Sequence, residues 1–203
     1  MRLRNKTAII TGGASGIGGA TSKLFCKEGA RVAILDINEK AGQEIASKIN
    51  LSGGEAIFLK TDVSRSEEIS KSIDDVIKKF NKIDILFNHA GTIIVKPLHK
   101  STEDDYNYLM DINVRSAFLT CSKIIPHMME SGGGSIVITS SIGGEKGFAY
   151  ESLYCMTKGA VLQLARSIAV EYRDNNIRCN AVCPAFVKTC LLYTSDAADD
   201  TPC

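Results

Sequence analysis

The sequence lacks basic clusters, long apolar runs and the cysteine spacing of zinc sites, which are features of nucleic-acid-binding, membrane and zinc proteins. Its formal net charge is only +1 and its 24 lysines and arginines are scattered, so we expect no nucleic-acid partner. No apolar run is long enough to cross a bilayer, and the opening MRLRNKTAII lacks the apolar region of a signal peptide. The seven cysteines fit no zinc or redox spacing, so we expect no metal, reduced thiols and a cytoplasmic protein.

Internal repeats, linkers and low-complexity tracts are also absent, and 203 residues with 44% hydrophobic content predict one domain with a sizeable core. Short apolar runs alternate with amphipathic segments. This alternation is typical of an α/β fold, a doubly wound parallel sheet with right-handed crossovers. The expected strands are 7–11, 31–36, 55–60, 83–87, a run around 136–138, and 177–183; the expected helices include 38–50, 66–80, parts of 101–131, and a segment from Tyr150 onward.

A glycine-rich turn follows the first expected strand. Gly12 to Gly18 reads GGASGIG and leads into a helical pattern. Glycines let the backbone approach a phosphate, and a helix N-terminus offers free N–H groups. Asp36 ends the second strand twenty residues after Gly16, where a carboxylate can bind adenosine ribose hydroxyls and repel a 2′-phosphate. The glycine-rich turn and Asp36 together predict a dinucleotide site that prefers NAD over NADP, although Asp36 could instead cap the helix at 38–50.

Tyr154 and Lys158 stand four residues apart at the start of the last long helix, so both lie on one helical face. A free tyrosine has a pKa of about 10, and a nearby cation favours its phenolate. Lys158 could therefore bring Tyr154 into a range useful for acid–base catalysis, with a serine from the preceding strand holding a substrate oxygen. Taken alone, the pair could equally be an accidental surface contact.

Together these segments resemble the short-chain dehydrogenase/reductase family, in its compact single-domain branch, from about Lys6 to Thr189. The ordered set of motifs is more specific than any one of them. It comprises Thr11-Gly-x-x-x-Gly-x-Gly18, Asp62, Asn88-x-Ala-Gly91, Asn113, Ser141, Tyr154-x-x-x-Lys158 and the segment Pro184 to Thr189.

The resemblance implies hydride transfer between a nicotinamide cofactor and an alcohol or ketone. Tyr154 would be the general acid–base, Ser141 would orient the carbonyl oxygen, and Lys158 would hold the nicotinamide ribose. Asn113 would support a water relay to that lysine, which makes these four the expected catalytic set. The implied cofactor contacts are Gly12, Ser15, Gly16, Ile17, Gly18, Asp36, Asp62, Val63, Asn88, Ala90, Gly91, Tyr154, Lys158, Pro184, Val187 and Thr189. A homo-oligomer, dimer or tetramer, is also implied.

The chain departs from the family pattern in three places. His89 replaces the family's second asparagine, and Ala185 replaces the usual glycine after Pro184. Family members of this branch continue for several dozen residues after the position of Thr189, whereas residues 190–203 begin CLLYTSDAADD, which resembles a translated sequencing adapter. We therefore expect a domain at 1–189 that is C-terminally truncated, and an artefactual tail at 190–203 without function.

The leading hypothesis is an NAD-dependent alcohol dehydrogenase or ketone reductase for a small-molecule substrate, with weak or no activity in a truncated chain. Apolar pocket walls are expected from Ile93, Ile94, Phe148, Ala149 and Phe186, although these residues could be ordinary core. One alternative is an NADPH-dependent 3-oxoacyl thioester reductase, against which Asp36 argues. The other is a dinucleotide-binding protein without catalysis, against which the complete catalytic set argues.

Overall fold

A computed structural model describes residues 1–187 of the chain. Residues 188–203 lie outside the described part, and with them the expected cofactor contact Thr189 and the expected tail at 190–203. No helix within residues 1–187 is both long and apolar enough to cross a membrane.

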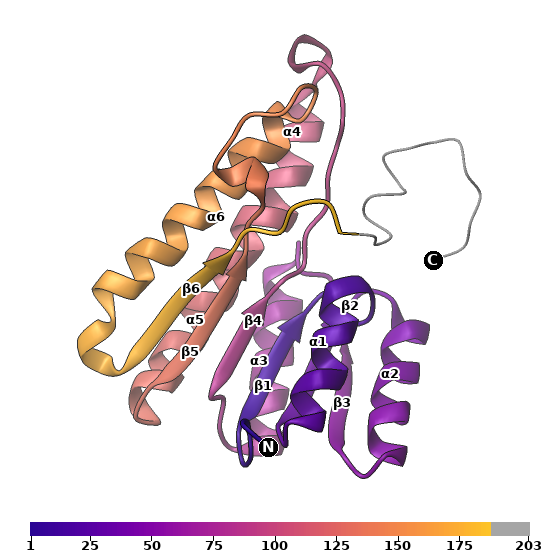
Figure 1. The fold of residues 1–203 in the computed structure, drawn as a ribbon, viewed down its shortest axis with the longest axis vertical. Helices are drawn as coiled ribbons and strands as arrows, with labels where there is room; N and C mark the ends of the chain where they lie inside the picture. Colours follow the sequence, from indigo (N-terminus) through magenta and orange to yellow (C-terminus); the bar gives the residue numbers. More distant parts are fainter. Residues whose placement is uncertain (188–203) are drawn as a thin grey trace.

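The described residues form an α/β fold built on a six-stranded sheet in the order β3-β2-β1-β4-β5-β6, with every neighbouring pair parallel (Figure 1). The order reverses between β1 and β4, and a crevice opens above the carboxyl ends of the strands at such a switch point. The strands are β1 (Thr7–Thr11), β2 (Arg31–Asp36), β3 (Glu55–Lys60), β4 (Ile85–Asn88), β5 (Gly134–Thr139) and β6 (Ile177–Val182). The predicted α/β fold is thus confirmed, with strand ends shifted by one or two residues in β4 and β6.

Helices cover both faces of the sheet. The α-helices are α1 (Gly16–Lys27), α2 (Glu39–Leu51), α3 (Ser66–Phe80), α4 (Glu103–Leu109), α5 (Ser116–Glu130) and α6 (Ser152–Glu171). Short turns of tighter helix are η1 (Leu98–Lys100), η3 (Ile142–Gly144) and η4 (Arg173–Asn175), and η2 (Met110–Arg115) is a wider π-helical turn. Helix α6 begins at Ser152 rather than Tyr150, because Tyr150 has a φ of 66° and cannot start a right-handed helix.

Alternating strand residues divide the core between the two faces. Ile9, Leu86 and Ile136 point into a cluster with α3, α5 and α6. Ile10, Ile34 and the aromatic ring of Phe87 point into a second cluster with α1 and α2. This division follows from the two-residue period of a strand, which sends neighbouring side chains to opposite faces.

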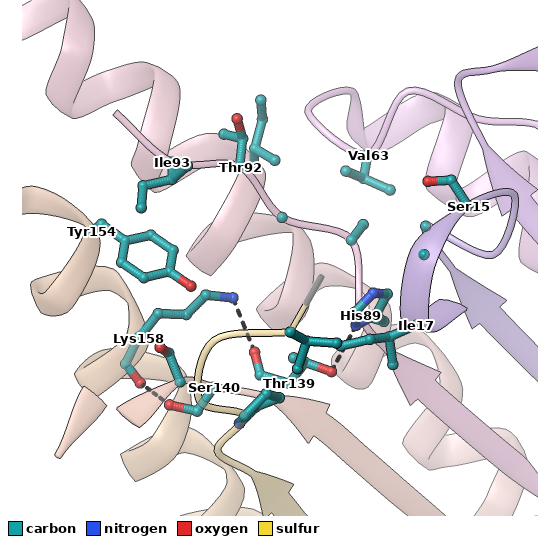
Figure 2. A pocket seen from close by; sticks show the side chains of 18 of the residues that line it. Ser15, Ile17, Val63, His89, Thr92, Ile93, Thr139, Ser140, Tyr154 and Lys158 are labelled. Carbon is teal, nitrogen blue, oxygen red and sulfur yellow. Dashed lines mark hydrogen bonds between the residues drawn. The ribbon is translucent and has the colours of Figure 1, made fainter. Parts of the chain in front are cut away.

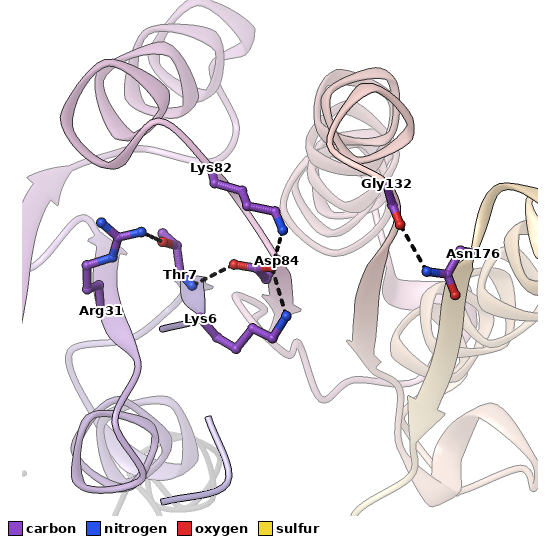
Figure 3. A network of polar contacts seen from close by, with 7 residues as sticks. All are labelled: Lys6, Thr7, Arg31, Lys82, Asp84, Gly132 and Asn176. Atoms are coloured by element: carbon purple, nitrogen blue, oxygen red, sulfur yellow. Dashed lines mark hydrogen bonds and ion pairs between the residues drawn. The ribbon is translucent and has the colours of Figure 1, made fainter. Parts of the chain in front are cut away.

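At the amino ends of the strands a buried carboxylate holds β1 to β4. Asp84 accepts hydrogen bonds from the backbone N–H of Thr7 at 3.0 Å and from Lys6 Nζ at 3.1 Å (Figure 3). Lys82 Nζ lies 2.9 Å from the same carboxylate. Burial raises the pKa of Asp84, but the hydrogen bond from Thr7 and the two lysines outweigh burial and hold the pKa below its ordinary value. This network fixes the strand register at the end of the sheet opposite the crevice.

Candidate active site

A cavity of about 620 Å³ lies at the carboxyl ends of β1, β2, β4 and β5. It reaches from the glycine turn after β1 to the start of α6. Among the residues singled out from the sequence, those that line it are Gly12, Ser15, Gly16, Ile17, Asp36, Asp62, Val63, Ala90, Gly91, Ser141, Tyr154, Lys158, Pro184 and Val187. Gly18, Asn88 and Asn113 do not line it directly. Of the expected apolar walls, Ile93, Phe148 and Phe186 line it, and Ile94 and Ala149 do not.

The glycine turn needs glycine for two separate physical reasons. Gly12 has a φ of 64°, in the left-handed region that side chains disfavour, and a Cβ there would meet the backbone of Ala90 at 3.0 Å. Gly18 is buried, and its Cβ would lie 2.0 Å from the carbonyl oxygen of Gly12. Gly18 therefore lets α1 pack closely against the turn rather than facing the cavity. The exposed Ser15 precedes α1 and makes no capping hydrogen bond, so its hydroxyl and the first N–H groups of the helix can meet an anion.

Two acids border the cavity at the ends of β2 and β3. One oxygen of Asp36 accepts a hydrogen bond from Ala14 N and the other accepts one from Asn38 N, each at 2.9 Å. The helix cap is made by Asn38, whose side chain accepts from Ala41 N, so Asp36 is not the N-cap of α2. Asp62 accepts hydrogen bonds from the N–H and hydroxyl of Ser64 through a single oxygen. Each carboxylate retains lone pairs toward the cavity.

Asn88 and Asn113 lie beneath the cavity rather than on its wall. Asn88 accepts a hydrogen bond from the Thr11 hydroxyl at 3.3 Å and donates to the carbonyl of Ala117 in α5. It therefore ties β1, β4 and α5 together. Thr11 in turn accepts from the backbone N–H groups of His89 and Ala90, so this buried network fixes the path of the chain after β4.

Asn113 lies in the π-helical turn between α4 and α5 and is only 3% exposed. Its oxygen accepts from Thr92 N at 2.8 Å, and its amide donates to Thr92 O and to the hydroxyl of Thr157 in α6. The general expectation for an asparagine within a helix is a solvated or locally bonded side chain, but here the wider turn directs it inward. Asn113 thus joins the loop after β4 to α6, directly behind Gly91.

The two serines after β5 have separate roles. Ser140 is buried, and its hydroxyl donates to the carbonyl of Lys158 at 2.7 Å, which anchors the loop to α6 (Figure 2). Ser141 accepts a hydrogen bond from Gly143 N at 3.0 Å and lines the cavity. Its hydrogen bonding also acts on the phenol of Tyr154. The geometry thus favours Ser141 over Ser140 for contact with a bound molecule.

Tyr154 and Lys158 face the cavity from the first turns of α6 (Figure 2). Tyr154 is 8% exposed and Lys158 is 4% exposed. Lys158 Nζ donates to the carbonyl of Thr139 at 3.0 Å and lies 5.7 Å from the centre of the Tyr154 ring. Gly91 packs over this lysine, because a Cβ at Gly91 would lie 3.2 Å from both Lys158 Nζ and Asn113 Oδ1.

The expected effect of Lys158 on Tyr154 is not met in the described residues. Burial raises the pKa of the Tyr154 phenol, hydrogen bonding to Ser141 lowers it in part, and the charge of Glu151 raises it again. Burial also lowers the pKa of Lys158 from 10.5 to about 8. Desolvation is the largest cause of both shifts, and neither shift has a contribution from the charge of the other group.

Other residues of the site gave no clear signal in the sequence. His89 Nδ1 lies 3.0 Å from the Thr139 hydroxyl, and its ring stacks on Phe87 with 5.2 Å between centroids. Burial, and then the charge of Lys158, lower the pKa of His89 to about 4, so the imidazole is neutral at neutral pH. Thr139 therefore contacts both His89 and Lys158. Further lining residues that sequence reasoning missed are Leu35, Ile37, Thr61, Thr92, Tyr108, Ile112, Thr139, Ser140, Ile142 and Glu151.

No metal site accompanies these residues in the described part of the chain, where no group of three His, Cys, Asp or Glu side chains gathers closely enough to hold an ion.

Known proteins resemble this chain over most of its length. The pattern of the short chain dehydrogenase family matches residues 6–200. An uncharacterized oxidoreductase of Thermotoga maritima is 39% identical over 202 residues, which is 100% of this chain and 80% of the relative. A 3-oxoacyl-[acyl-carrier-protein] reductase of Chlamydia pneumoniae is 36% identical over 187 residues, 92% of this chain and 75% of the relative. Among solved structures, a 3-ketoacyl-(acyl-carrier-protein) reductase from Brucella melitensis complexed with NADH superposes with a TM-score of 0.90 at 30% identity, covering 95% of this chain and 80% of its own.

Proposed function

The chain belongs to the short chain dehydrogenase family and is an NAD(P)-dependent oxidoreductase, and on that premise we propose that it transfers a hydride between NAD and a secondary alcohol or ketone. Tyr154 is the general acid–base in this proposal. Ser141 orients the substrate oxygen, Lys158 holds the nicotinamide ribose, and Asn113 supports the lysine.

One observation carries the proposal. The side chains of Ser141, Tyr154 and Lys158 border the same cavity as the glycine turn and Asp36. A nucleotide site and an acid–base pair are therefore within reach of one bound dinucleotide. A protein that only sensed the dinucleotide would have no use for a phenol and a serine hydroxyl side by side at the far end of its site.

The residues present fit a nicotinamide dinucleotide. Gly91 leaves open the space that a Cβ would fill beside Lys158 and Asn113. Lys158 has three N–H donors, of which one is bonded to Thr139 O, so two remain to bind ribose hydroxyls. Ser15 and the start of α1 would take the phosphates. When bound, the nicotinamide supplies the hydride for ketone reduction or accepts it in alcohol oxidation.

The proton is the part of the reaction that this chain's own residues carry. With its pKa raised, Tyr154 keeps its proton at neutral pH and can donate it to a ketone oxygen that Ser141 holds by a hydrogen bond. For alcohol oxidation the phenol must first lose this proton. A cation at Lys158 favours that loss, and the ribose hydroxyls bound to the lysine would connect the phenol to it.

NAD is the preferred cofactor in this proposal. Asp36 presents a carboxylate at the end of β2, where it would bind ribose hydroxyls and repel a 2′-phosphate. The test compares kcat/KM for NAD and NADP with a panel of secondary alcohols. We expect NAD to be favoured, whereas equal values or a preference for NADP would overturn the assignment of NAD. Absence of any dinucleotide binding would overturn the proposed function as a whole.

A second candidate is reduction of a 3-oxoacyl thioester with NADPH. The similarity to acyl-carrier-protein reductases of Chlamydia pneumoniae and Brucella melitensis favours this substrate. Asp36 disfavours NADPH for the reason given above. An assay with an acetoacetyl thioester and each reduced cofactor separates the two candidates.

We also propose that the protein assembles as a homo-oligomer. Large apolar side chains are exposed on two helices, with Phe118 and Met129 on α5 and Met156 and Val170 on α6. Such side chains are more often found at interfaces than in contact with water when they gather on neighbouring helices. Sedimentation velocity would show a dimer or tetramer, and a monomer at micromolar concentration would refute the proposal.

A reducing, cytoplasmic setting completes the proposal. Cys26, Cys121, Cys155, Cys179 and Cys183 are all free in the described part of the chain, and three of them are buried. Free buried thiols are usual in reducing compartments. Fractionation of cells that express the protein would test this location.

A further inference from the structure

The half of the cavity beyond Tyr154 is mostly apolar, and Glu151 is the one acid that the described residues place there. Its walls include Ile93, Ile142 and the edge-to-face pair of Phe148 and Phe186, whose ring centres lie 6.2 Å apart. Asp36 and Asp62 lie at the opposite end, after β2 and β3. The carboxylate of Glu151 is thus the negative charge that a substrate would meet beside Tyr154.

The backbone directs Glu151 to this place. Tyr150 has a φ of 66°, which turns the chain, and Glu151 N then donates to Phe148 O at 3.3 Å. Glu151 is the residue before α6 and its carbonyl accepts from Cys155 N. Glu151 stands three positions before Tyr154, so the two side chains lie near each other at the start of α6. The negative charge of Glu151 accordingly acts on the pKa of the Tyr154 phenol.

No partner within residues 1–187 satisfies the Glu151 carboxylate. It caps no backbone N–H of α6, and no lysine, arginine or hydroxyl of the described residues forms a hydrogen bond or ion pair with it. The oxygens of Glu151 are open to solvent, because the buried side-chain atoms without a partner in the described residues are Arg31 Nε and His127 Nε2. Partial burial still raises the pKa of Glu151. A bound substrate that displaces this solvent would have to supply a donor in its place.

We propose that Glu151 selects substrates that carry a second hydrogen-bond donor, a hydroxyl or a protonated amine, near the alcohol that reacts at Tyr154. The same charge disfavours substrates with a carboxylate at that position. Vicinal diols and amino alcohols, or the corresponding hydroxy and amino ketones, are the substrate class that follows. This inference rests on the proposed function, because it presumes that the alcohol reacts at Tyr154.

Four compounds with one common ring test the selection: cyclohexanol, trans-cyclohexane-1,2-diol, trans-2-aminocyclohexanol and trans-2-hydroxycyclohexanecarboxylate. The measured quantity is kcat/KM for reduction of NAD at pH 7. For the native chain we expect the diol and the amino alcohol to exceed cyclohexanol by at least about tenfold, the effect of one hydrogen bond to a charged group. We expect the carboxylate compound to fall below cyclohexanol.

Two substitutions separate charge from hydrogen bonding. Glu151→Gln removes the charge but keeps a hydrogen-bond acceptor. The diol should therefore keep part of its higher kcat/KM relative to cyclohexanol, whereas the amino alcohol should no longer exceed cyclohexanol. Glu151→Leu should abolish both preferences and improve the carboxylate compound relative to cyclohexanol. Because Glu151 makes no capping bond, neither substitution removes a contact from α6. Glu145→Gln is the matched control, an exposed acid on the same loop that does not line the cavity.

The outcomes distinguish this inference from the function on which it rests. If the ranking of the four compounds is the same in the native chain and in Glu151→Leu, or changes as much in Glu145→Gln, the inference fails and the dehydrogenase function stands. If turnover is too slow to rank, calorimetric binding of the same compounds to the protein with NADH gives the ranking, and equal affinities for native chain and Glu151→Leu overturn it. If NADH itself does not bind, the proposed function fails first.

Discussion

The Nζ atom of Lys158 donates a hydrogen bond to the carbonyl oxygen of Thr139, the last residue of β5, over 3.0 Å (Figure 2). The bond spans from α6 to the sheet and holds a buried ammonium at the carboxyl end of the strands. Thr139 also contacts His89 through its hydroxyl. The position of the lysine therefore depends on α6, on the end of β5 and on His89 after β4. A substitution in any of the three should shift the ammonium and so change cofactor binding.

Tyr154→Phe should reduce turnover by about 10²–10⁴-fold, because the substitution keeps the ring but removes the proton donor. Affinity for NADH should change little, since the phenol acts on the substrate oxygen. Steady-state kinetics and fluorescence titration with NADH measure the two quantities. Tyr172→Phe, at the far end of the same helix, is the control and should keep full turnover. Near-native turnover in Tyr154→Phe would exclude the phenol as the acid–base.

Lys158 should make stability depend on pH in a defined window. Its folded pKa is lowered from 10.5 to about 8, so between those values the unfolded chain binds more protons than the folded one. The free energy of unfolding should therefore rise as the pH increases from about 8 to 10.5. Below pH 8 the lysine is charged in both states, and the folded state bears the full destabilisation of a buried charge. The rise amounts to at most about 3 kcal/mol.

Lys158→Met removes the ionisable group and should flatten this rise. Urea denaturation at pH 7, 8, 9 and 10 measures it as the difference between the native chain and the variant. Lys40→Met, which alters an exposed lysine on α2, should leave the pH dependence as it is in the native chain. If the free energy of unfolding depended on pH in the same way for the native chain and Lys158→Met, the pKa of Lys158 would not be lowered by folding.

Gly91→Ala should weaken NADH binding by roughly 5- to 150-fold, the equivalent of about 1–3 kcal/mol of overpacking. The added methyl group would lie 3.2 Å from Lys158 Nζ and from Asn113 Oδ1, so the lysine must move away from its place beside the cofactor. Gly147→Ala is the matched control, since nothing lies within 4 Å of a Cβ there. Equal NADH affinity in the two variants would contradict a cofactor role for the space above Gly91.

Asp36→Ala should lower the ratio of kcat/KM for NAD over NADP by about 10–100-fold, because it removes the charge and the acceptors that discriminate against a 2′-phosphate. The variant also frees Ala14 N and Asn38 N, so Asp36→Asn is made beside it to retain one acceptor. Asp62→Asn, another acid on the cavity wall, should alter both cofactors alike. A ratio unaffected by both changes at Asp36 would place the discrimination elsewhere.

The sequence alone determined the α/β class and the approximate strand positions, and it indicated many of the residues that line the cavity. Strands and helices were readable because short apolar runs and amphipathic helical patterns are local properties of the sequence. The glycine turn, Asp36 and the Tyr154–Lys158 pair were readable because each depends on spacing within one element or one strand-turn-helix unit. The family resemblance predicted Ser141 rather than Ser140. Both serines line the cavity, and they differ because the Ser140 hydroxyl is bonded to the carbonyl of Lys158.

Only the tertiary structure decided what depends on burial and on contacts between distant segments. Asn113 is directed inward by a π-helical turn toward Thr92 and Thr157, which no local pattern indicates. The pKa values of Tyr154 and Lys158 follow from desolvation by elements far apart in the chain, so spacing alone predicted the wrong balance between them. Glu151 reads in the sequence as an ordinary acid near a helix start. Its proposed role follows from the mostly apolar cavity that it lines, which is built by segments from distant parts of the chain. Within residues 1–187 no side chain pairs with its carboxylate there.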